Sequence, residues 1–112
     1  MPILNVDYSD LNFDEMAASI GLKPKHIPIL VGSFLEESVS ILEALSNAVE
    51  SKDFDSIKAH AHSIKGSSGN LKFTEIYEMT REMELAASES NADFDYKAYL
   101  NAVLSAIATI PN

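Results

Sequence analysis

The residues best suited to chemistry are two histidines in the stretch HAHSIKGSSGNL, which spans residues 60–71. A neutral imidazole is a good nucleophile near neutral pH, and a pair of imidazoles can bind a metal ion. On a helix, however, chelating histidines lie four positions apart, whereas His60 and His62 would diverge by about 200° because each residue turns about 100°. A strand would allow chelation, but the flanking apolar residues recur at helical spacing. We therefore expect no metal site here.

His62 shares its side of the predicted helix with small residues that leave the surface bare. The apolar stripe of this helix places His62 about 120° from the core and His60 at the core boundary. Gly66 and Gly69 follow His62 by one and two turns, although a glycine inside a helix costs about 1 kcal/mol relative to alanine. Close packing of a neighbouring helix, or fraying of the helix end, would explain these glycines. Their exposed side instead favours the close approach of another molecule.

Lys65 adds a positive charge to the same surface, three residues after His62. An ammonium group at this spacing leans beside the imidazole and can balance the charge of a phosphoryl group bound to a ring nitrogen. The combination of an exposed nucleophile, a neighbouring cation and a bare surface fits a phosphate carrier.

The elements that must position this stretch are all predicted to be helices. Apolar residues recur every three or four positions in five segments, over about residues 12–20, 25–49, 53–69, 73–89 and 94–109. The connections are short, which favours antiparallel neighbours, and no strand or hairpin pattern occurs. The expected fold is an all-α, antiparallel four-helix bundle over about residues 25–110, with a short additional N-terminal helix over about residues 12–20. One domain is expected across residues 1–112.

Individual residues mark the expected helix ends and core positions. Gly21 is the expected end of the first helix, and Asp53 and Asp93 are the expected N-caps of the third and fifth helices. On the second helix, the predicted core stripe includes Phe34, Val39 and Leu42 among its apolar residues. On the fourth helix the stripe is rich in methionine.

The composition excludes several classes of protein. The chain has no cysteine, and its 8 basic and 17 acidic side chains give a net charge of −9, which disfavours nucleic acid and anionic membrane surfaces. It has no run of 18 apolar residues and no secretory signal pattern, so we expect no membrane insertion and a cytoplasmic location. No Walker loop, dinucleotide fingerprint or nucleophile elbow is present. We therefore expect no ATP site, no autophosphorylation and no cofactor of the chain's own.

The stretch AHSIKGSSGNL closely resembles the signature of histidine-containing phosphotransfer (HPt) domains. That signature has a histidine on a bundle helix, an aliphatic residue two positions on, Lys-Gly at three and four positions on, and small residues after them. The positions that match it are His62, Ile64, Lys65, Gly66, Ser67, Ser68 and Leu71. The helical layout is also similar to this family over about residues 10–110.

The resemblance implies a function for the stretch. His62 would take a phosphoryl group from a receiver-domain aspartate and pass it to another receiver, with Lys65 balancing phosphate charge and Gly66 leaving room for the docking receiver. Mg²⁺ is expected in the partner receiver, which would supply most of the catalysis. The family commonly has glycine where this chain has Lys72. We expect Lys72 to alter the turn into the fourth helix or to add positive charge near the docking face.

Weaker candidates for a binding surface surround His62. Lys58 lies one turn before it and is a candidate for the docking surface, although an exposed lysine needs no special role. Ser67 and Ser68 would either bond phosphate or simply keep the surface small. Gly69 would extend the bare surface.

The predicted helices also suggest roles for residues outside this stretch and for His60. Phe13 and Met16 are expected to leave an apolar edge near the His62 face, which in this family would contact a receiver. Arg81 and Glu84 are expected to form an ordinary charged face. His60 is expected to be a boundary residue.

Three functions are compatible with the sequence. The favoured one is a phosphorelay intermediate between receivers. The second is the phosphoryl-accepting domain of a chemotaxis-type histidine kinase, which would receive phosphate from an ATP-binding kinase domain. The third is a helical adaptor that binds without transferring. None of them makes the chain an autonomous kinase, and only the third would survive loss of His62.

Overall fold

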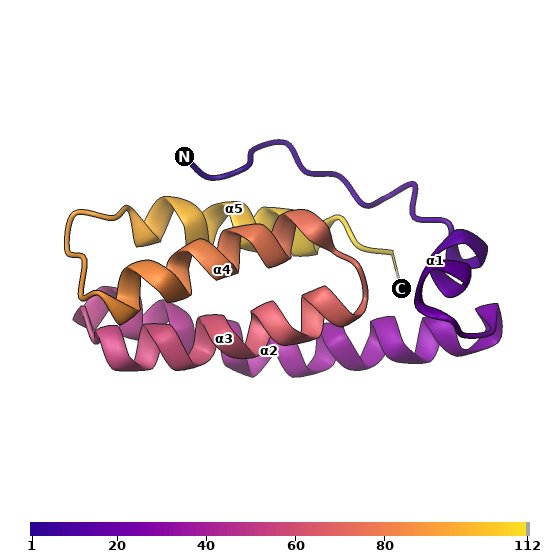
Figure 1. Ribbon diagram of the computed structural model, residues 1–112, viewed down its shortest axis with the longest axis horizontal. Helices are drawn as coiled ribbons and strands as arrows, with labels where there is room; N and C mark the ends of the chain where they lie inside the picture. Colours follow the sequence, from indigo (N-terminus) through magenta and orange to yellow (C-terminus); the bar gives the residue numbers. More distant parts are fainter. Residues whose placement is uncertain (112) are drawn as a thin grey trace.

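The computed structural model describes residues 1–111. Within these residues the elements are helices and one 3₁₀ turn, with no strand: α1 (Phe13–Ile20), η1 (Pro24–His26), α2 (Ile27–Ser51), α3 (Phe54–Asn70), α4 (Thr74–Ser88) and α5 (Tyr96–Ala108). Figure 1 shows α2 to α5 as an elongated bundle of antiparallel neighbours, with α1 at one end. The predicted all-α bundle with a short N-terminal helix is therefore confirmed.

Local capping sets the ends of the first helices. Asn12 accepts hydrogen bonds from two backbone N–H groups in the first turn of α1, and Gly21 ends that helix in the left-handed conformation at φ 76°. Asp53 caps α3, because its carboxylate accepts from the backbone N–H of Ser56 at 3.2 Å. The ends at Gly21 and Asp53 lie where the sequence predicted them.

The start of α5 differs from the prediction, which placed the N-cap at Asp93. The carboxylate of Asp95 accepts from the backbone N–H of Ala98 at 3.0 Å, so Asp95 is the N-cap. Phe94 packs its ring against Tyr96, with centroids 4.9 Å apart. Phe94 is partly buried against the core and lies before the first helical residue, Tyr96.

The core runs along the bundle and follows the predicted stripes closely. On α3, Ile57, Ala61 and Ile64 are fully buried, as expected. The exception is on α2, where Val39 is 68% exposed and Ser38 is buried in its place. Ser38 is four residues from Phe34 and satisfies its hydroxyl by donating to the Phe34 carbonyl at 2.6 Å. The small satisfied hydroxyl is in phase with the stripe, whereas Val39 is turned about 100° away from it.

An extended segment before α1 lies against the bundle, which the helical pattern did not predict. Figure 1 shows it running along the side of α4 and α5. The backbone N–H of Tyr8 donates to Thr109 Oγ1 at 2.8 Å, and its hydroxyl donates to Glu75 Oε1 at 2.8 Å. The ring of Tyr8 also packs on Phe73, with centroids 4.9 Å apart. These contacts hold the segment against the C-terminal end of α5 and the start of α4.

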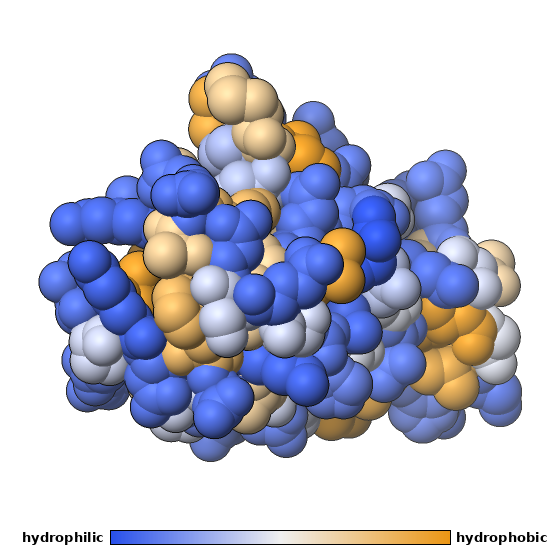
Figure 2. Space-filling model, turned by 60° about the vertical axis from the view of Figure 1, so that its left-hand side comes forward, coloured by the Kyte–Doolittle hydropathy of each residue, from blue (hydrophilic) through white to orange (hydrophobic). Residues whose placement is uncertain are grey.

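The outer surface of the bundle is mostly hydrophilic. Figure 2 shows hydrophobic residues on the viewed face only in small, separate patches. No helix among residues 1–111 is long and apolar enough to cross a membrane.

Candidate functional site

The middle of α3 presents His62 to solvent. Its side chain is 65% exposed, whereas the preceding residue, Ala61, is fully buried. His60, on the other flank of the helix, is half-buried. The two imidazoles thus lie in different environments, as the helical phase predicted. Within residues 1–111 no group of three or more His, Cys, Asp or Glu side chains is arranged to hold a metal ion.

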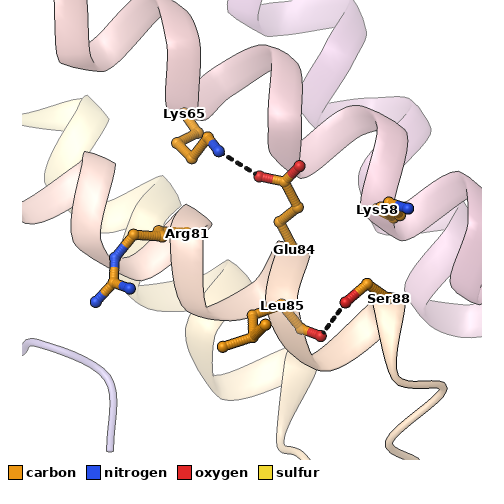
Figure 3. Close-up of a pocket in the computed structure, with 6 residues that line it drawn as sticks. All are labelled: Lys58, Lys65, Arg81, Glu84, Leu85 and Ser88. Carbon is orange, nitrogen blue, oxygen red and sulfur yellow. Dashed lines mark hydrogen bonds and ion pairs between the residues drawn. The ribbon is translucent and has the colours of Figure 1, made fainter.

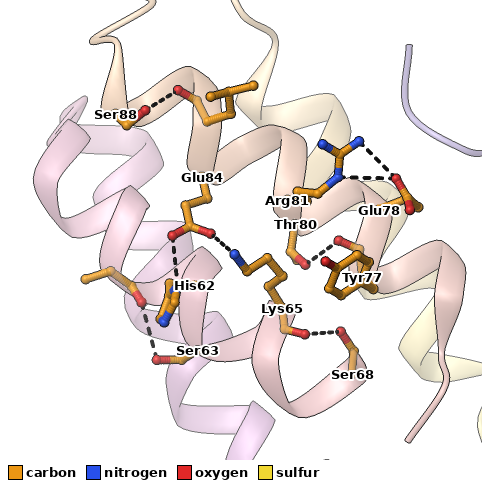
Figure 4. A network of polar contacts seen from close by, with 12 residues as sticks. His62, Ser63, Lys65, Ser68, Tyr77, Glu78, Thr80, Arg81, Glu84 and Ser88 are labelled. Carbon is orange, nitrogen blue, oxygen red and sulfur yellow. Dashed lines mark hydrogen bonds and ion pairs between the residues drawn. The ribbon is translucent and has the colours of Figure 1, made fainter. Parts of the chain in front are cut away.

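Glu84 on α4 joins His62 to Lys65. One carboxylate oxygen, Oε2, lies 2.8 Å from His62 Nδ1, and the other, Oε1, lies 2.6 Å from Lys65 Nζ (Figure 4). A carboxylate at Nδ1 favours the neutral tautomer that carries its proton on that nitrogen. The lone pair is then left on Nε2, which makes Nε2 the nucleophilic atom of the ring.

The charge of Glu84 is stabilised by its two partners. Partial burial would raise the pKa of this carboxyl group, but the hydrogen bonds from Lys65 and His62 outweigh it and lower the pKa below its usual value. Glu84 is therefore ionised near neutral pH. An ionised carboxylate fixes the orientation of the His62 ring and can balance a positive charge that develops on it.

The sequence predicts that Glu84 and Arg81 form an ordinary charged face, and for Glu84 this prediction is wrong. Arg81 is indeed paired within its own helix, with Nη2 3.1 Å from Glu78 Oε2. Glu84 differs because the α3–α4 hairpin places it opposite His62. His62 lies eleven residues before Phe73 and Glu84 lies eleven residues after it. Equal distances from the turn were the available signal, since antiparallel helices pair residues in this way.

Gly66 leaves open space one turn after His62. A Cβ atom built at Gly66 would have no neighbouring atom within 4 Å, apart from its own helix. Nothing inside the protein therefore requires a glycine at this position. The expectation that Gly66 gives access to an outside partner stays compatible with the structure.

Gly69 has a different environment from the one predicted. A Cβ atom there would lie 3.0 Å from Cδ1 of Tyr77, so the absence of a side chain allows the α4 ring to pack against α3. The prediction that Gly69 extends the bare surface beside His62 is wrong. Close packing of a neighbouring helix explains this glycine, and the hairpin register explains the partner, since both residues lie four positions from Phe73.

The two serines are directed to their own helix. Ser68 is fully buried and donates to the Lys65 carbonyl at 3.2 Å, so the prediction of a surface role for Ser68 is wrong. It lies in phase with the buried Ile64, four residues earlier, which turns it inward. Ser67 is half-buried and donates to the Ser63 carbonyl at 3.1 Å.

Phe13 and Met16 do not form the predicted apolar edge near His62. Met16 is only 7% exposed and belongs to the core, and Phe13 is partly buried against it. α1 packs mainly against η1 and α2 and lies beyond the C-terminal end of α3 (Figure 1). That end is eight residues after His62, which is about 12 Å of helix. The expectation failed because the position of α1 depends on its packing and not on its own pattern.

Lys72 lies in the turn between α3 and α4, where the sequence predicts either an altered turn or an added positive charge. Its backbone is left-handed, with φ 63°. This conformation is nearly free of strain for glycine and unfavourable for a residue with a Cβ atom. The lysine therefore occupies a position whose geometry suits the glycine that is common in similar domains.

Two adjoining surface depressions surround the site. The first, here called the His62 cleft, is lined by Asp55, Lys58, Ala59, His62 and Glu84. The second, here called the Lys65 groove, is lined by Lys58, Lys65, Arg81, Glu84, Leu85 and Ser88 (Figure 3). Lys58 and Glu84 border both depressions. Lys58 is thus the one weak candidate that the structure brings directly beside His62.

Comparison with known proteins identifies the family. The model of the Hpt domain family matches residues 29–109, and the chain therefore belongs to this family. Hpt domains carry out histidine phosphotransfer in two-component systems and interact with receiver domains. The match covers the bundle and leaves α1 outside it. No curated protein and no solved structure matched the chain.

Proposed function

We propose that this protein is a phosphorelay intermediate that accepts a phosphoryl group on His62 from a receiver-domain aspartate and passes it to another receiver. The observation that carries the proposal is the exposed imidazole whose Nδ1 lies 2.8 Å from Glu84. This contact leaves Nε2 available to react, and the open space at Gly66 leaves room for a partner. The cytoplasmic location expected from the sequence is part of this proposal.

The transfer step uses the lone pair of Nε2. That pair attacks the phosphorus atom and forms the N–P bond, while the P–O bond to the donor aspartate breaks and its electron pair remains on the aspartate carboxylate. The proton on Nδ1 stays on the ring, which becomes positively charged. Glu84 balances this charge from 2.8 Å. Passing the phosphoryl group to a second aspartate is the reverse reaction with another receiver.

The partner supplies the remaining parts of the reaction. We expect the receiver to bring the reacting aspartate and the Mg²⁺ ion that neutralises phosphoryl oxygens. This chain would contribute the nucleophile, its orientation and nearby positive charge. It would therefore act as a protein carrier of the phosphoryl group and not as an autonomous kinase.

The first test is phosphorylation without ATP, using phosphoramidate or a phosphorylated receiver as donor. Intact mass is measured for wild type, His62→Gln and His60→Gln. We expect an acid-labile gain of one phosphoryl group in wild type and in His60→Gln, and no gain in His62→Gln. Absence of any gain in wild type with several receivers would overturn the proposal and leave a kinase-fed acceptor domain or an adaptor.

A further inference from the structure

Lys65 forms an ion pair with Glu84 in this structure. Its ammonium nitrogen lies 2.6 Å from Glu84 Oε1, and its side chain is only 24% exposed. The same carboxylate holds His62 Nδ1 through its other oxygen. If Lys65 moved to a phosphoryl group, it would have to leave a partly buried ion pair, which is more costly to break than a fully exposed one. Lys65 is thus placed to hold Glu84.

The reactive nitrogen of His62 faces away from this ion pair. Because Nδ1 points to Glu84, the second ring nitrogen is directed elsewhere, and Figure 4 shows it pointing away from the carboxylate. A phosphoryl group on Nε2 would therefore project away from both Glu84 and Lys65. Another cation on the surface around the ring would be better placed to meet it.

Lys58 is that cation. It lies four residues before His62, and helical side chains lean toward the N-terminus, so the imidazole extends over the turn that carries Lys58. The two residues line the same His62 cleft, together with Asp55, Ala59 and Glu84. Figure 3 shows Glu84 between Lys65 and Lys58, with an ion pair to Lys65 alone.

The charges in the two depressions favour the same residue. Among residues 1–111, the ion pairs of the Lys65 groove engage Lys65 with Glu84 and Arg81 with Glu78, and none engages Lys58. A phosphoryl group carries about −2 charge, which would draw an unpaired ammonium group toward it.

We propose that Lys58 contacts the phosphoryl group carried on His62, and that Lys65 acts as a positioning residue that holds Glu84. The inference rests on the proposed function of His62. It divides between two lysines the role that the family resemblance gives to Lys65 alone.

The test compares charge removal at the two lysines, using phosphoramidate as the donor. The Nε2–P bond forms as the P–N bond of phosphoramidate breaks, and the leaving nitrogen takes the electron pair and a solvent proton. Lys58→Gln, Lys65→Gln and Lys58→Arg are compared with wild type. Lys97→Gln is the matched control, because Lys97 is a lysine on α5 with a 71% exposed side chain. The initial rate of phosphoryl uptake and the lifetime of phosphohistidine after donor removal are followed by intact mass.

We expect Lys58→Gln to lower uptake about fivefold, since a partly exposed charge contact contributes on the order of 1 kcal/mol. It should also shorten the phosphohistidine lifetime. Lys58→Arg should restore both values and Lys97→Gln should change neither, with the three variants at Lys58 and Lys97 melting like wild type. Lys65→Gln should have a smaller effect on uptake than Lys58→Gln.

Two results would overturn the assignment. If Lys58→Gln matches wild type, or if only Lys65→Gln lowers uptake, then Lys58 does not serve the phosphoryl group while His62 still carries it. If wild type takes up no phosphoryl group at all, the function proposed for His62 fails first, and the role of Lys58 fails with it. The wild-type measurement therefore separates the two failures.

Discussion

Gly66 and Gly69 are three residues apart on α3, yet they have different reasons to be glycine. Around Gly66 there is open space, whereas at Gly69 the ring of Tyr77 on α4 would lie 3.0 Å from an added Cβ atom. The first glycine serves nothing within the described chain, and the second is required by internal packing. A bare position on a helix is thus evidence of an outside partner only when no inside neighbour fills the space.

The α3–α4 hairpin produces this difference. Its register places Tyr77 opposite Gly69, and places Glu84 opposite His62. One end of the hairpin is therefore closed by an aromatic contact, and the other is linked by a polar contact that leaves an imidazole exposed. The four predictions that follow test this contrast.

The largest effect is expected for Gly66→Leu. A leucine side chain would occupy the open space and obstruct a docking receiver, so transfer from a phosphorylated receiver should fall on the order of a hundredfold, or about 2.7 kcal/mol. Phosphorylation by phosphoramidate should fall far less, because this small donor needs much less room beside His62 than a receiver domain does. Both rates are measured by intact mass. Unchanged transfer from the receiver would show that no partner needs the space at Gly66.

At Gly69, the same substitution should act on stability instead. Gly69→Leu should lower the free energy of unfolding by about 2 kcal/mol, because the side chain overpacks against Tyr77. Urea denaturation measures this loss, and uptake from phosphoramidate should remain normal in the folded protein. In a double-mutant cycle with Tyr77→Ala, the penalty of Gly69→Leu should become smaller. A penalty of equal size with and without the ring would argue against the contact.

A smaller change of opposite sign is expected at the end of the hairpin. Lys72→Gly should raise the free energy of unfolding by about 1 kcal/mol, since glycine relieves the strain of a left-handed residue. Lys72→Ala is the matched control, because it removes the charge and keeps the strain. Thermal denaturation should show stabilisation for glycine only. Equal stabilisation by both variants would assign the effect to charge.

The smallest effect is a pH dependence of stability. The Glu84–His62 contact should cause it, and the Tyr77–Gly69 contact should not. Because the pKa of Glu84 lies below its usual value of 4.5 in the folded protein, its contribution is present above that value and is lost as pH falls through the lowered pKa. The stability difference between wild type and Glu84→Gln should therefore shrink in acid. Urea midpoints at several pH values measure it, and Gly69→Leu should show no such change.

The sequence alone determined the helices, most of the core and the central histidine. Periodicity is enough for these features, because the apolar stripe fixes which side of each helix is buried and so turns His62 outward. The signature around His62 then indicated the family. The same local reasoning predicted two helix ends, at Gly21 and Asp53. Each of these residues acts within a few residues of its own position.

Contacts between residues of different helices depend on how the helices pack. The pairing of Glu84 with His62, the packing of Tyr77 on Gly69 and the position of α1 away from His62 each depend on helix register and crossing. No single-helix pattern contains that information, because a side chain on the flank of one helix finds its partner only when the neighbouring helix is placed. Burial of Ser68 and exposure of Val39 have a local cause instead, because Ser68 is in phase with Ile64 and Val39 is out of phase with Phe34 on its own helix.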